Sequence, residues 1–451
     1  MIRLLSVLVF SLVLASAARA ARGRQYPKPA SPKDKSDYGR HIQRTMTLLA
    51  TSTPHKRNTV KVLFYGQSIT VQKWWKDVEK DLRRRFPHAD IVCENRALGG
   101  FASQLLVRTA EYDLYPFYPD LLIFHVYGHH VRYEDIIRRT RQRTTAEILI
   151  QTDHVTKAVE ARWTKMMNYT FLPQYAKKYN CRLSRIRESW KRYLKDNKLK
   201  PQQLLRDAVH LNAQGEFLMA ELVKQELVYR PELPQDEWRD MVRTYVVGRD
   251  VKWQGDRLRL EFEGNRVDAI AGKGGKRSAR VLIDGRKPSE FPECYYHARP
   301  SGTAGVGWPA IKRISFQKPL VLETWTATFT DFNDAQDEFR FAVAGSKTGP
   351  DGNGTGKERF VSESGRVVID PEDWVFAYCR RVSKNRTPNG FKVRWKVEGP
   401  FTDVYTPAQI KDPSREYATT LAQGLENAAH TLELIGKAPV AALRVYKPPV
   451  K

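Results

Sequence analysis

Residues 61–70, with the sequence KVLFYGQSIT, decide the fold of this chain. The four residues after Lys61 are apolar and favour a buried strand, and Gly66 permits the sharp turn with which such a strand ends. Residues 71–86 then place apolar side chains at helical spacing among charged ones. The stretch therefore predicts a strand that turns directly into an amphipathic helix, with Ser68 at the turn.

The position of Ser68 has two interpretations. Ligands bind at the carboxyl edge of an open α/β sheet, and a hydroxyl held there beside a helix N-terminus is placed to attack a carbonyl carbon. A serine at the same position can also do no more than cap the helix. The stretch by itself leaves both interpretations open, so other motifs have to decide between them.

Strands and helices alternate through the rest of the first half. Apolar runs predict three further strands, at residues 90–95, 120–127 and 146–152. Helices are predicted at residues 104–112, 131–143 and 216–229, and residues 157–197 are predicted to be mostly helical. Such alternation indicates a parallel sheet covered by helices on both faces. We therefore predict an α/β domain over residues 58–232.

The second half has a different character. From residue 244 onward, short β-rich runs are separated by Gly, Asp, Asn and Pro, which indicates an all-β sandwich. We predict this β-sandwich domain over residues 240–451. The glycine-rich segment 345–357 is predicted to be a flexible loop without fold content.

The N-terminal residues predict export. Residues 1–20 contain Arg3, an apolar run and Ala18-Arg19-Ala20, the pattern of a cleaved signal peptide. Residues 21–57 are predicted to be a linker followed by an N-terminal helix. The apolar run is too short to span a bilayer, and no later segment approaches the about 20 apolar residues that a spanning helix needs. We therefore expect a secreted or periplasmic protein with no integral membrane segment.

The chain is strongly basic. Its formal net charge is +26, and Lys and Arg are dense between residues 177 and 200. Such a field attracts polyanions: nucleic acid, an anionic lipid surface or an acidic polysaccharide. For an exported chain the last two are more accessible, so no nucleic-acid partner is expected. A solvated basic helix is the alternative interpretation of the same segment.

The cysteines leave two alternatives open. Cys93, Cys181, Cys294 and Cys379 are widely spaced, without the C-x-x-C pattern that suggests zinc. Export permits disulfides, and pairing Cys93 with Cys181 and Cys294 with Cys379 would keep each bridge within one predicted domain. Four buried thiols are the alternative.

Asp207 and His210 stand near the end of the predicted α/β domain, in the sequence DAVHLN. Serine hydrolysis needs a base within hydrogen-bond reach of the hydroxyl and an acid that orients the base. An Asp and a His three positions apart on one turn can present both groups together. With Ser68 after the first strand, these residues provide the parts of a proton relay.

Residues 60–230 resemble the SGNH or GDSL-type hydrolase superfamily, because its motifs occur here in order. The blocks are Gly66-Gln67-Ser68-Ile69 for the usual G-D-S, Asn95 followed by Gly99-Gly100, and Asp207 to His210 for D-x-x-H. The resemblance implies a flavodoxin-like sheet and esterase activity. It also implies roles for four residues: Ser68 as nucleophile, His210 as general base, Asp207 as orienting acid and Gly100 as oxyanion donor.

Two positions depart from the family's pattern. Gln67 replaces the usual Asp, and a G-Q-S variant is similar to that of some carbohydrate acetylesterases, which favours a sugar-ester substrate. The third block, usually G-x-N-D, reads Gly128-His129-His130, so the oxyanion Asn has no match. Loss of one oxyanion donor costs about 3 kcal/mol. We expect His130, or Asn95, to help in its place.

Another use of the histidines is a metal site made of His125, His129 and His130. His125 is expected to point to the opposite face of its strand from a ligand at the rim, which argues against such a site. We therefore expect neither a metal nor an organic cofactor.

We predict an exported serine esterase that hydrolyses acyl esters, above all acetyl esters, of a polysaccharide. If the basic charge of the chain serves to bind this polysaccharide, the polysaccharide is an anionic one. The β-rich second half looks like the jelly-roll modules attached to carbohydrate-active esterases. One alternative is a lipase or phospholipid esterase of the same superfamily, although no long apolar loop flanks Ser68. The other is a non-catalytic carbohydrate-binding protein, which the missing Asn suggests.

Overall fold

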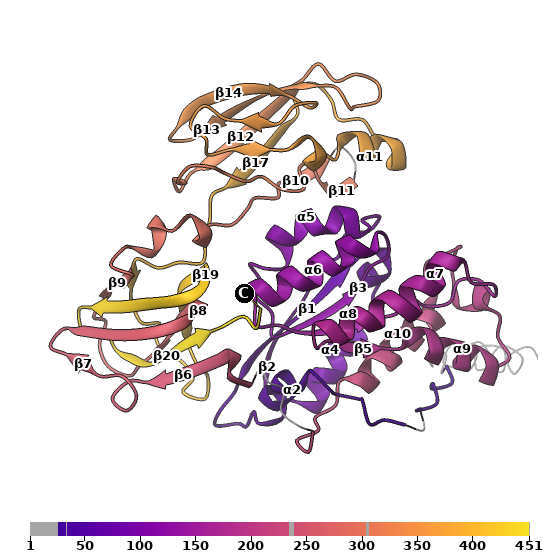
Figure 1. Cartoon of the computed structure of the whole chain (residues 1–451), viewed down its shortest axis with the longest axis horizontal. Helices are drawn as coiled ribbons and strands as arrows, with labels where there is room; N and C mark the ends of the chain where they lie inside the picture. Colours follow the sequence, from indigo (N-terminus) through magenta and orange to yellow (C-terminus); the bar gives the residue numbers. More distant parts are fainter. Residues whose placement is uncertain (1–25, 33, 234–238, 304–305, 451) are drawn as a thin grey trace, which may run out of the picture.

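A computed structural model describes residues 26–32, 34–233, 239–303 and 306–450 of the chain. The predicted signal peptide, residues 1–20, lies outside these ranges. Figure 1 shows an α/β body and two β bodies, one built around β8 (Arg257–Ala271) and β19 (Ala418–Ile435), the other around β12 (Thr324–Thr330) and β13 (Arg340–Gly345). The predicted fold class, a parallel α/β sheet followed by antiparallel β structure, is confirmed.

The α/β body contains a five-stranded sheet in which all neighbouring strands are parallel. In sheet order the strands are β2 (Asp90–Asn95), β1 (Thr59–Gly66), β3 (Leu121–His125), β4 (Glu147–Gln151) and β5 (Arg182–Ser184). The order of the strands reverses at β1 and β3, where Gly66 lies opposite His125. Ligand crevices form at the carboxyl ends of strands at such a switch point, and Ser68 follows β1 there.

Helices cover both faces of this sheet (Figure 1). They are α2 (Gln43–Ala50), α3 (Ser68–Val71), α4 (Trp74–Arg85), α5 (Ser103–Asp113), α6 (His130–Arg143), α7 (Arg162–Met166), α8 (Leu172–Lys178), α9 (Ile186–Asp196) and α10 (Ala213–Glu226). Val60, Val62 and Phe64 of β1 pack with α4, α9 and α10. Leu63 and Tyr65 pack on the opposite face with α5, α6 and α8. Burial on both faces explains the continuous apolar run in the sequence. Within the described ranges, no helix combines the length and the apolar composition needed to cross a bilayer.

The segment 157–197, predicted to be mostly helical, also contains a strand. It includes α7, a π-helical turn (Met167–Phe171), α8 and α9, but β5 lies between α8 and α9 at the edge of the sheet. Three residues are too few to show the alternation of a strand in the sequence. Arg182 in β5 can be buried because its guanidinium pairs with the carboxylate of Glu226 in α10 at 2.7 Å.

The β8–β19 unit is a seven-stranded antiparallel sheet. Besides β8 and β19 it contains β6 (Val242–Val246), β7 (Trp253–Gln254), β9 (Ala279–Ile283), β18 (Val404–Tyr405) and β20 (Val440–Tyr446). Its main order is β18-β9-β19-β8-β20-β6, and β7 pairs with β8. The two longest strands pair along most of their length and form the centre of the unit.

The β12–β13 unit, residues 296–400, is inserted between β9 and β18. Its four-stranded sheet has the order β14-β13-β12-β17, with β14 (Gly349–Thr355) and β17 (Lys392–Lys396) at the edges. Shorter elements complete it: β10 (Ser301–Thr303), β11 (Val306–Pro309), β15 (Phe360–Val361), β16 (Val368–Ile369) and α11 (Phe376–Ser383). The two units have separate cores, around Leu432 and Phe329 respectively. The strands that were expected in one β-sandwich are therefore divided between two units.

The prediction of a flexible loop at residues 345–357 is wrong, because β14 pairs with β13 there. The glycines serve packing: a Cβ atom on Gly354 would lie 2.6 Å from the Phe341 ring, and one on Gly356 would lie 2.4 Å from the Phe339 ring. A backbone without side chains lets these rings approach the strand. In the sequence the same glycines resemble turn signals.

None of the four cysteines is joined to another, so the two disulfides considered above are not formed. Cys181, Cys294 and Cys379 are buried, and Cys93 is half-buried. Burial raises the pKa of Cys93 and of Cys294 to about 12. These thiols are therefore protonated at neutral pH and behave as small apolar side chains.

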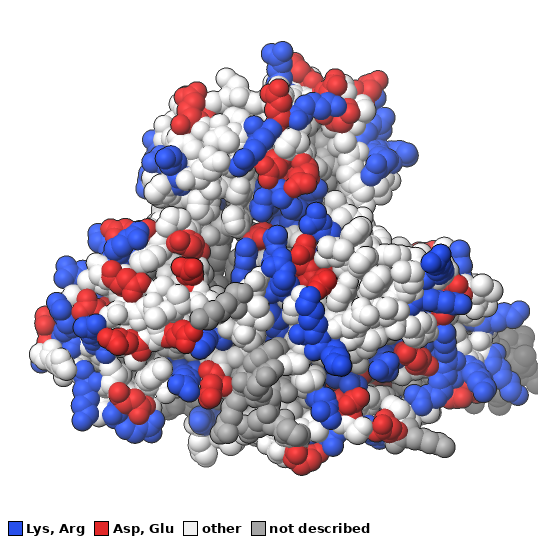
Figure 2. Space-filling model, in the orientation of Figure 1, with Lys and Arg blue, Asp and Glu red and all other residues white. Residues whose placement is uncertain are grey.

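The basic segment 177–200 is partly internal to the α/β body. Four of its cations lie within 2.7 Å of a carboxylate: Lys178 with Glu134, Arg182 with Glu226, and Arg187 and Lys191 with Glu160. Over the face of the molecule shown in Figure 2, Lys and Arg side chains are interspersed with Asp and Glu. Pairing of this kind cancels part of the positive field that the sequence suggests.

Candidate active site

Ser68 lies where β1 ends and α3 begins. Gln67 is the N-cap of α3, and its Oε1 accepts a hydrogen bond from the Ile69 N–H at 2.9 Å. Only glycine fits at position 66, because a Cβ atom there would lie 1.9 Å from the His125 carbonyl oxygen. The close contact of β1 with β3 therefore sets the turn that presents Ser68 at the carboxyl edge of the sheet.

The structure brings Ser68, His210 and Asp207 together. Ser68 Oγ lies 2.9 Å from His210 Nε2, and His210 Nδ1 lies 2.8 Å from Asp207 Oδ2. The Asp207 carboxylate also accepts the backbone N–H groups of His210 and Val209 at 2.8 and 2.9 Å. These backbone donors, with the His210 imidazole, hold the pKa of Asp207 well below its usual value. An ionised Asp207 keeps the proton on Nδ1, which leaves Nε2 free to accept the Ser68 proton.

Two amide side chains hold His210 beside Ser68. Gln72, one turn after Ser68, accepts the Leu211 N–H at 3.0 Å and donates to the Leu211 carbonyl at 2.8 Å. Asn212 caps the N-terminus of α10 with its side-chain oxygen. The residue after His210 is therefore tied to the Ser68 segment, and the next residue begins α10.

The Gly99–Gly100 turn lies on another side of Ser68. A Cβ atom on Gly99 would lie 3.8 Å from Ser68 Cβ. Phe101 N–H donates to the Leu98 carbonyl at 3.2 Å, and Gly100 has a φ of 81°, as a type II turn requires at its third residue. In the part of the chain that the structure describes, the N–H groups of Ser68 and Gly100 donate to no protein acceptor. Both are available to an oxyanion.

Asn95 and His130, the other two expected oxyanion residues, are engaged with other partners. Asn95 Nδ2 donates to the Thr70 carbonyl at 2.6 Å. His130 begins α6, its ring is stacked on Phe171 with centroids 4.0 Å apart, and its Nδ1 lies 2.9 Å from the Tyr175 hydroxyl. Asn95 thus braces β2 against α3, and His130 belongs to an aromatic cluster.

A second His–Asp pair, absent from the sequence prediction, lies behind Ser68. His125 is buried, and its Nε2 lies 2.9 Å from Asp153 Oδ1. His125 Nδ1 lies 3.3 Å from Gln67 Nε2, and Gln67 Oε1 faces Ser68 Oγ at 2.9 Å. Burial opposes the ionisation of Asp153, but hydrogen bonds from His125 and Asn168 hold its pKa below the usual value. The polar residues at the ends of β3 and β4 were the signal that could have located this pair.

The Ser68 hydroxyl has one proton and two nearby acceptors. His210 Nε2 and Gln67 Oε1 each lie 2.9 Å from Oγ. Gln67 Oε1 keeps the Ile69 N–H as a donor whichever acceptor Ser68 uses. Donation of the Ser68 proton to His210 therefore leaves no buried oxygen without a hydrogen bond.

The histidines near the site are arranged for hydrogen bonding. His125 bonds to Gln67 and Asp153, and His130 bonds to Tyr175. Over the described ranges, no three His, Cys, Asp or Glu side chains gather as the ligands of a metal ion would.

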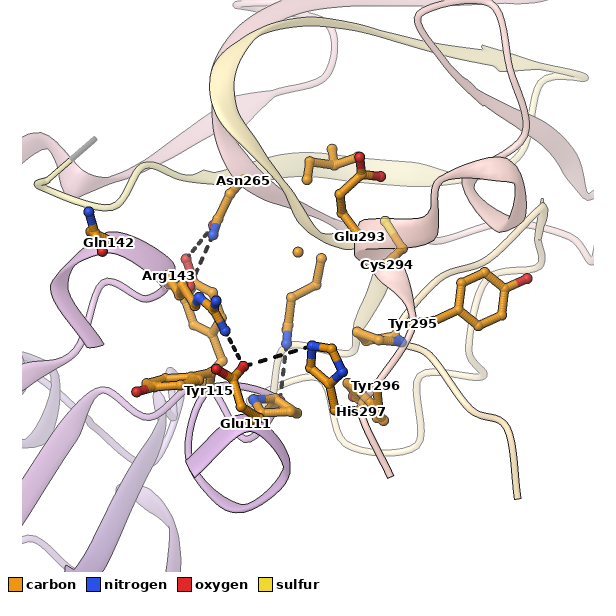
Figure 3. Close-up of a pocket in the computed structure, with 16 residues that line it drawn as sticks. Glu111, Tyr115, Gln142, Arg143, Asn265, Glu293, Cys294, Tyr295, Tyr296 and His297 are labelled. Atoms are coloured by element: carbon orange, nitrogen blue, oxygen red, sulfur yellow. Dashed lines mark hydrogen bonds and ion pairs between the residues drawn. The ribbon is translucent and has the colours of Figure 1, made fainter. Parts of the chain in front are cut away.

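A cavity of about 350 Å³ lies apart from Ser68, where α5 meets the two β units (Figure 3). Its wall includes Glu111, which accepts hydrogen bonds from Arg139 at 2.7 Å and from Arg143 and lies 3.9 Å from His297. Burial raises the pKa of Glu111, but the charges of Arg143, His297 and Arg139 outweigh it, and the resulting pKa lies below the usual value. These ion pairs stabilise the junction, and neither Ser68, His210 nor Asp207 lines the cavity.

No protein-family model and no curated protein sequence matches the chain. Among solved structures, an acetylxylan esterase from Geobacillus stearothermophilus is 19% identical, covers 40% of this chain and 98% of its own, and has a TM-score of 0.35. A two-domain esterase active on acetylated mannans is 13% identical, covers 92% of this chain and 98% of its own, and has a TM-score of 0.36. At these identities and TM-scores the likeness assigns nothing, and function has to be inferred from the site itself.

Proposed function

We propose that the chain is an exported serine esterase of the SGNH type that removes acyl groups, above all acetyl groups, from a polysaccharide. One observation carries the proposal: Ser68 Oγ lies 2.9 Å from His210 Nε2, and His210 Nδ1 lies 2.8 Å from Asp207 Oδ2. At these distances an imidazole can take a hydroxyl proton while a carboxylate orients it.

In the proposed mechanism Ser68 Oγ attacks the ester carbonyl carbon while His210 Nε2 takes the hydroxyl proton. His210 returns that proton to the leaving sugar oxygen, and the C–O bond to the sugar breaks, which leaves an acyl group on Ser68. Water then attacks the acyl carbon with His210 as base, and the carboxylic acid departs as Ser68 regains its proton. Asp207 holds the imidazole in one tautomer throughout.

Main-chain N–H groups stabilise the oxyanion in this proposal. Those of Ser68 and Gly100 have no protein acceptor within the described part of the chain. Removal of a single oxyanion donor costs about 3 kcal/mol, so donors of this kind account for a large part of the rate. In this proposal the two main-chain N–H groups replace the side-chain amide that the G-x-N-D block supplies in the family that the chain resembles.

Exposed aromatic rings near the carboxyl edge of the sheet support a sugar substrate. Tyr127, just after β3, and Trp163 are each 44% exposed, and the Trp163 ring lies 5.7 Å from that of His130. Rings exposed in this way can pack on the apolar faces of sugars. The G-Q-S sequence around Gln67 supports the same substrate class through its resemblance to carbohydrate acetylesterases.

The first test is the hydrolysis of p-nitrophenyl acetate by wild type and by Ser68→Ala. We expect kcat to fall by about 10⁴-fold or more, the usual effect of removing the nucleophile of such a triad. Ser278→Ala is the matched control, because Ser278 is exposed and its hydroxyl bonds to Thr406 at 2.7 Å in the β8–β19 unit. Equal rates for wild type and Ser68→Ala would overturn the proposal and leave a carbohydrate-binding protein.

The second test concerns the substrate. We expect the enzyme to release acetate from acetylated polysaccharides faster than it hydrolyses long-chain p-nitrophenyl esters. A preference for long acyl chains would instead identify a lipase or phospholipid esterase with the same Ser68 chemistry.

A further inference from the structure

The Gly99–Gly100 turn is held partly by residues of the β12–β13 unit. The Tyr378 hydroxyl, in α11, donates to the Gly100 carbonyl at 2.6 Å across 278 positions of sequence. Trp308, in β11, covers the same glycine, since a Cβ atom on Gly100 would lie 2.9 Å from its ring. The turn therefore has a hydrogen bond and a ring contact from outside the α/β body.

Tyr378 and Trp308 form a ring cluster with Phe101, the residue that closes the turn. Trp308 and Tyr378 are stacked at 5.2 Å, and both meet Phe101 edge to face, at 5.6 and 6.1 Å. Phe101 is fully buried. Packing against both Trp308 and Phe101 restricts the Tyr378 ring, so its hydroxyl is held in position toward Gly100.

An ion-pair network fastens α11 to α5. Arg108 of α5 binds Asp370 and Glu372 at 2.8 Å each and also binds Asp373, all just before α11. Asp373 is only 1% exposed. Figure 1 accordingly shows α11 and β11 lying against the end of the α/β body that carries α5. Separation of the residues before α11 from α5 would leave the buried Asp373 carboxylate without its Arg108 partner, which opposes separation of the two elements.

The turn needs such support because of its composition. Two successive glycines have no Cβ atoms to restrict φ and ψ, so the Gly100 N–H can point in several directions at little cost. The φ of 81° at Gly100 is only one of the available conformations. A bond to the carbonyl of Gly100, together with the Trp308 ring against its Cα, holds the residue in that conformation.

We propose that Tyr378 is a positioning residue for the oxyanion turn, so that the β12–β13 unit is a working part of the active site. The inference rests on the proposed esterase function, in which the Gly100 N–H binds the oxyanion. Tyr378 itself does not touch the reacting atoms. It acts through Gly100, by keeping the N–H pointed at the site where negative charge develops.

The test is Tyr378→Phe, which removes the hydroxyl and keeps the ring cluster. Loss of a whole oxyanion donor costs about 10²–10³-fold in kcat, so loosening one donor should lower kcat about tenfold. KM should not change, because the ground-state ester makes little use of the oxyanion site. The Ki of a boronic acid, whose tetrahedral adduct with Ser68 resembles the transition state, should rise by the same factor as kcat falls.

Tyr295→Phe is the matched control. The Tyr295 hydroxyl donates to the Ser289 carbonyl at 2.8 Å, so this variant loses the same type of hydrogen bond just before the β12–β13 unit begins, away from Gly100. We expect the two phenylalanine variants to have similar melting temperatures, and only Tyr378→Phe to lose kcat.

The outcomes separate this inference from the proposed function. A Ser68-dependent esterase in which Tyr378→Phe leaves kcat and Ki unchanged would overturn the inference alone. An equal loss of kcat in Tyr378→Phe and Tyr295→Phe would also overturn it, because a general loss of stability would explain both. A wild type without Ser68-dependent hydrolysis would overturn the proposed function itself.

Discussion

Replacement of His154 by glutamine should make the protein less sensitive to acid. His154 is 4% exposed, and its Nε2 donates to the Val209 carbonyl at 2.8 Å. Among the described residues, its other nitrogen has no hydrogen-bond partner, so a second proton would be buried without an acceptor. Burial lowers the pKa of His154 to about 4; the charges of His125 and Arg187 act in the same direction, and that of Asp153 opposes them.

The size of the effect follows from the two pKa values of His154. In the unfolded chain the pKa is 6.5, so the unfolded state binds the proton more tightly than the folded state. The stability contribution of the neutral ring is complete above the unfolded pKa and is lost as the pH falls through the window from 6.5 toward 4. Linkage gives a loss of about 2 kcal/mol between pH 7 and pH 5. In a body of this size, that loss lowers Tm by about 4–8 °C.

The assay is thermal unfolding of wild type and His154→Gln at pH 7, 6 and 5. The glutamine amide can still donate toward Val209 but does not titrate, and groups that titrate in both proteins cancel in the difference. We expect the Tm of wild type to fall by about 4–8 °C more than that of the variant between pH 7 and pH 5. Equal falls in Tm would refute the coupling of folding to the protonation of His154.

Two further predictions concern stability. Arg108→Met should lower the free energy of unfolding by about 3–5 kcal/mol, because Asp373, 1% exposed, would lose its partner; denaturant titration measures this, and an unchanged midpoint would contradict it. Gly66→Ala should sharply reduce the yield of folded protein, because its Cβ would lie 1.9 Å from the His125 carbonyl oxygen. Gly307→Ala, whose Cβ would meet nothing within 4 Å, is the control for that yield, and equal yields would contradict the prediction.

The strands of the α/β body were predictable because their signal is local. The predicted runs coincide with β1, β2, β3 and β4 to within about two residues, since a strand buried on both faces is apolar throughout. The short edge strand β5 and the glycine-rich β14 lack that signal. Both strands join their sheets through contacts with other segments. Arg182 of β5 pairs with Glu226, and the glycines of β14 and just after it accommodate the rings of Phe341 and Phe339.

The candidate site, too, was only partly predictable from the sequence. Ser68, Asp207 and His210 were identified from short motifs, and the structure brings their side chains within hydrogen-bond distance. The residues that hold these three side chains in place form no motif in the sequence. Gln67 is oriented by His125 from the neighbouring strand, and the turn beside Ser68 is held from a separate body of the protein.

The sequence by itself determined which segment ends in a reactive turn and which residue types surround it, because side-chain pattern and glycine act on the backbone within a few positions. Only the tertiary structure decided that the N–H groups of Ser68 and Gly100 meet no acceptor among the described residues, and which side chain restrains the turn. The physical reason is that hydrogen bonds and ring contacts weaken steeply with distance in space. Gly100 and Tyr378, 278 positions apart in the sequence, meet because the residues before α11 dock on α5.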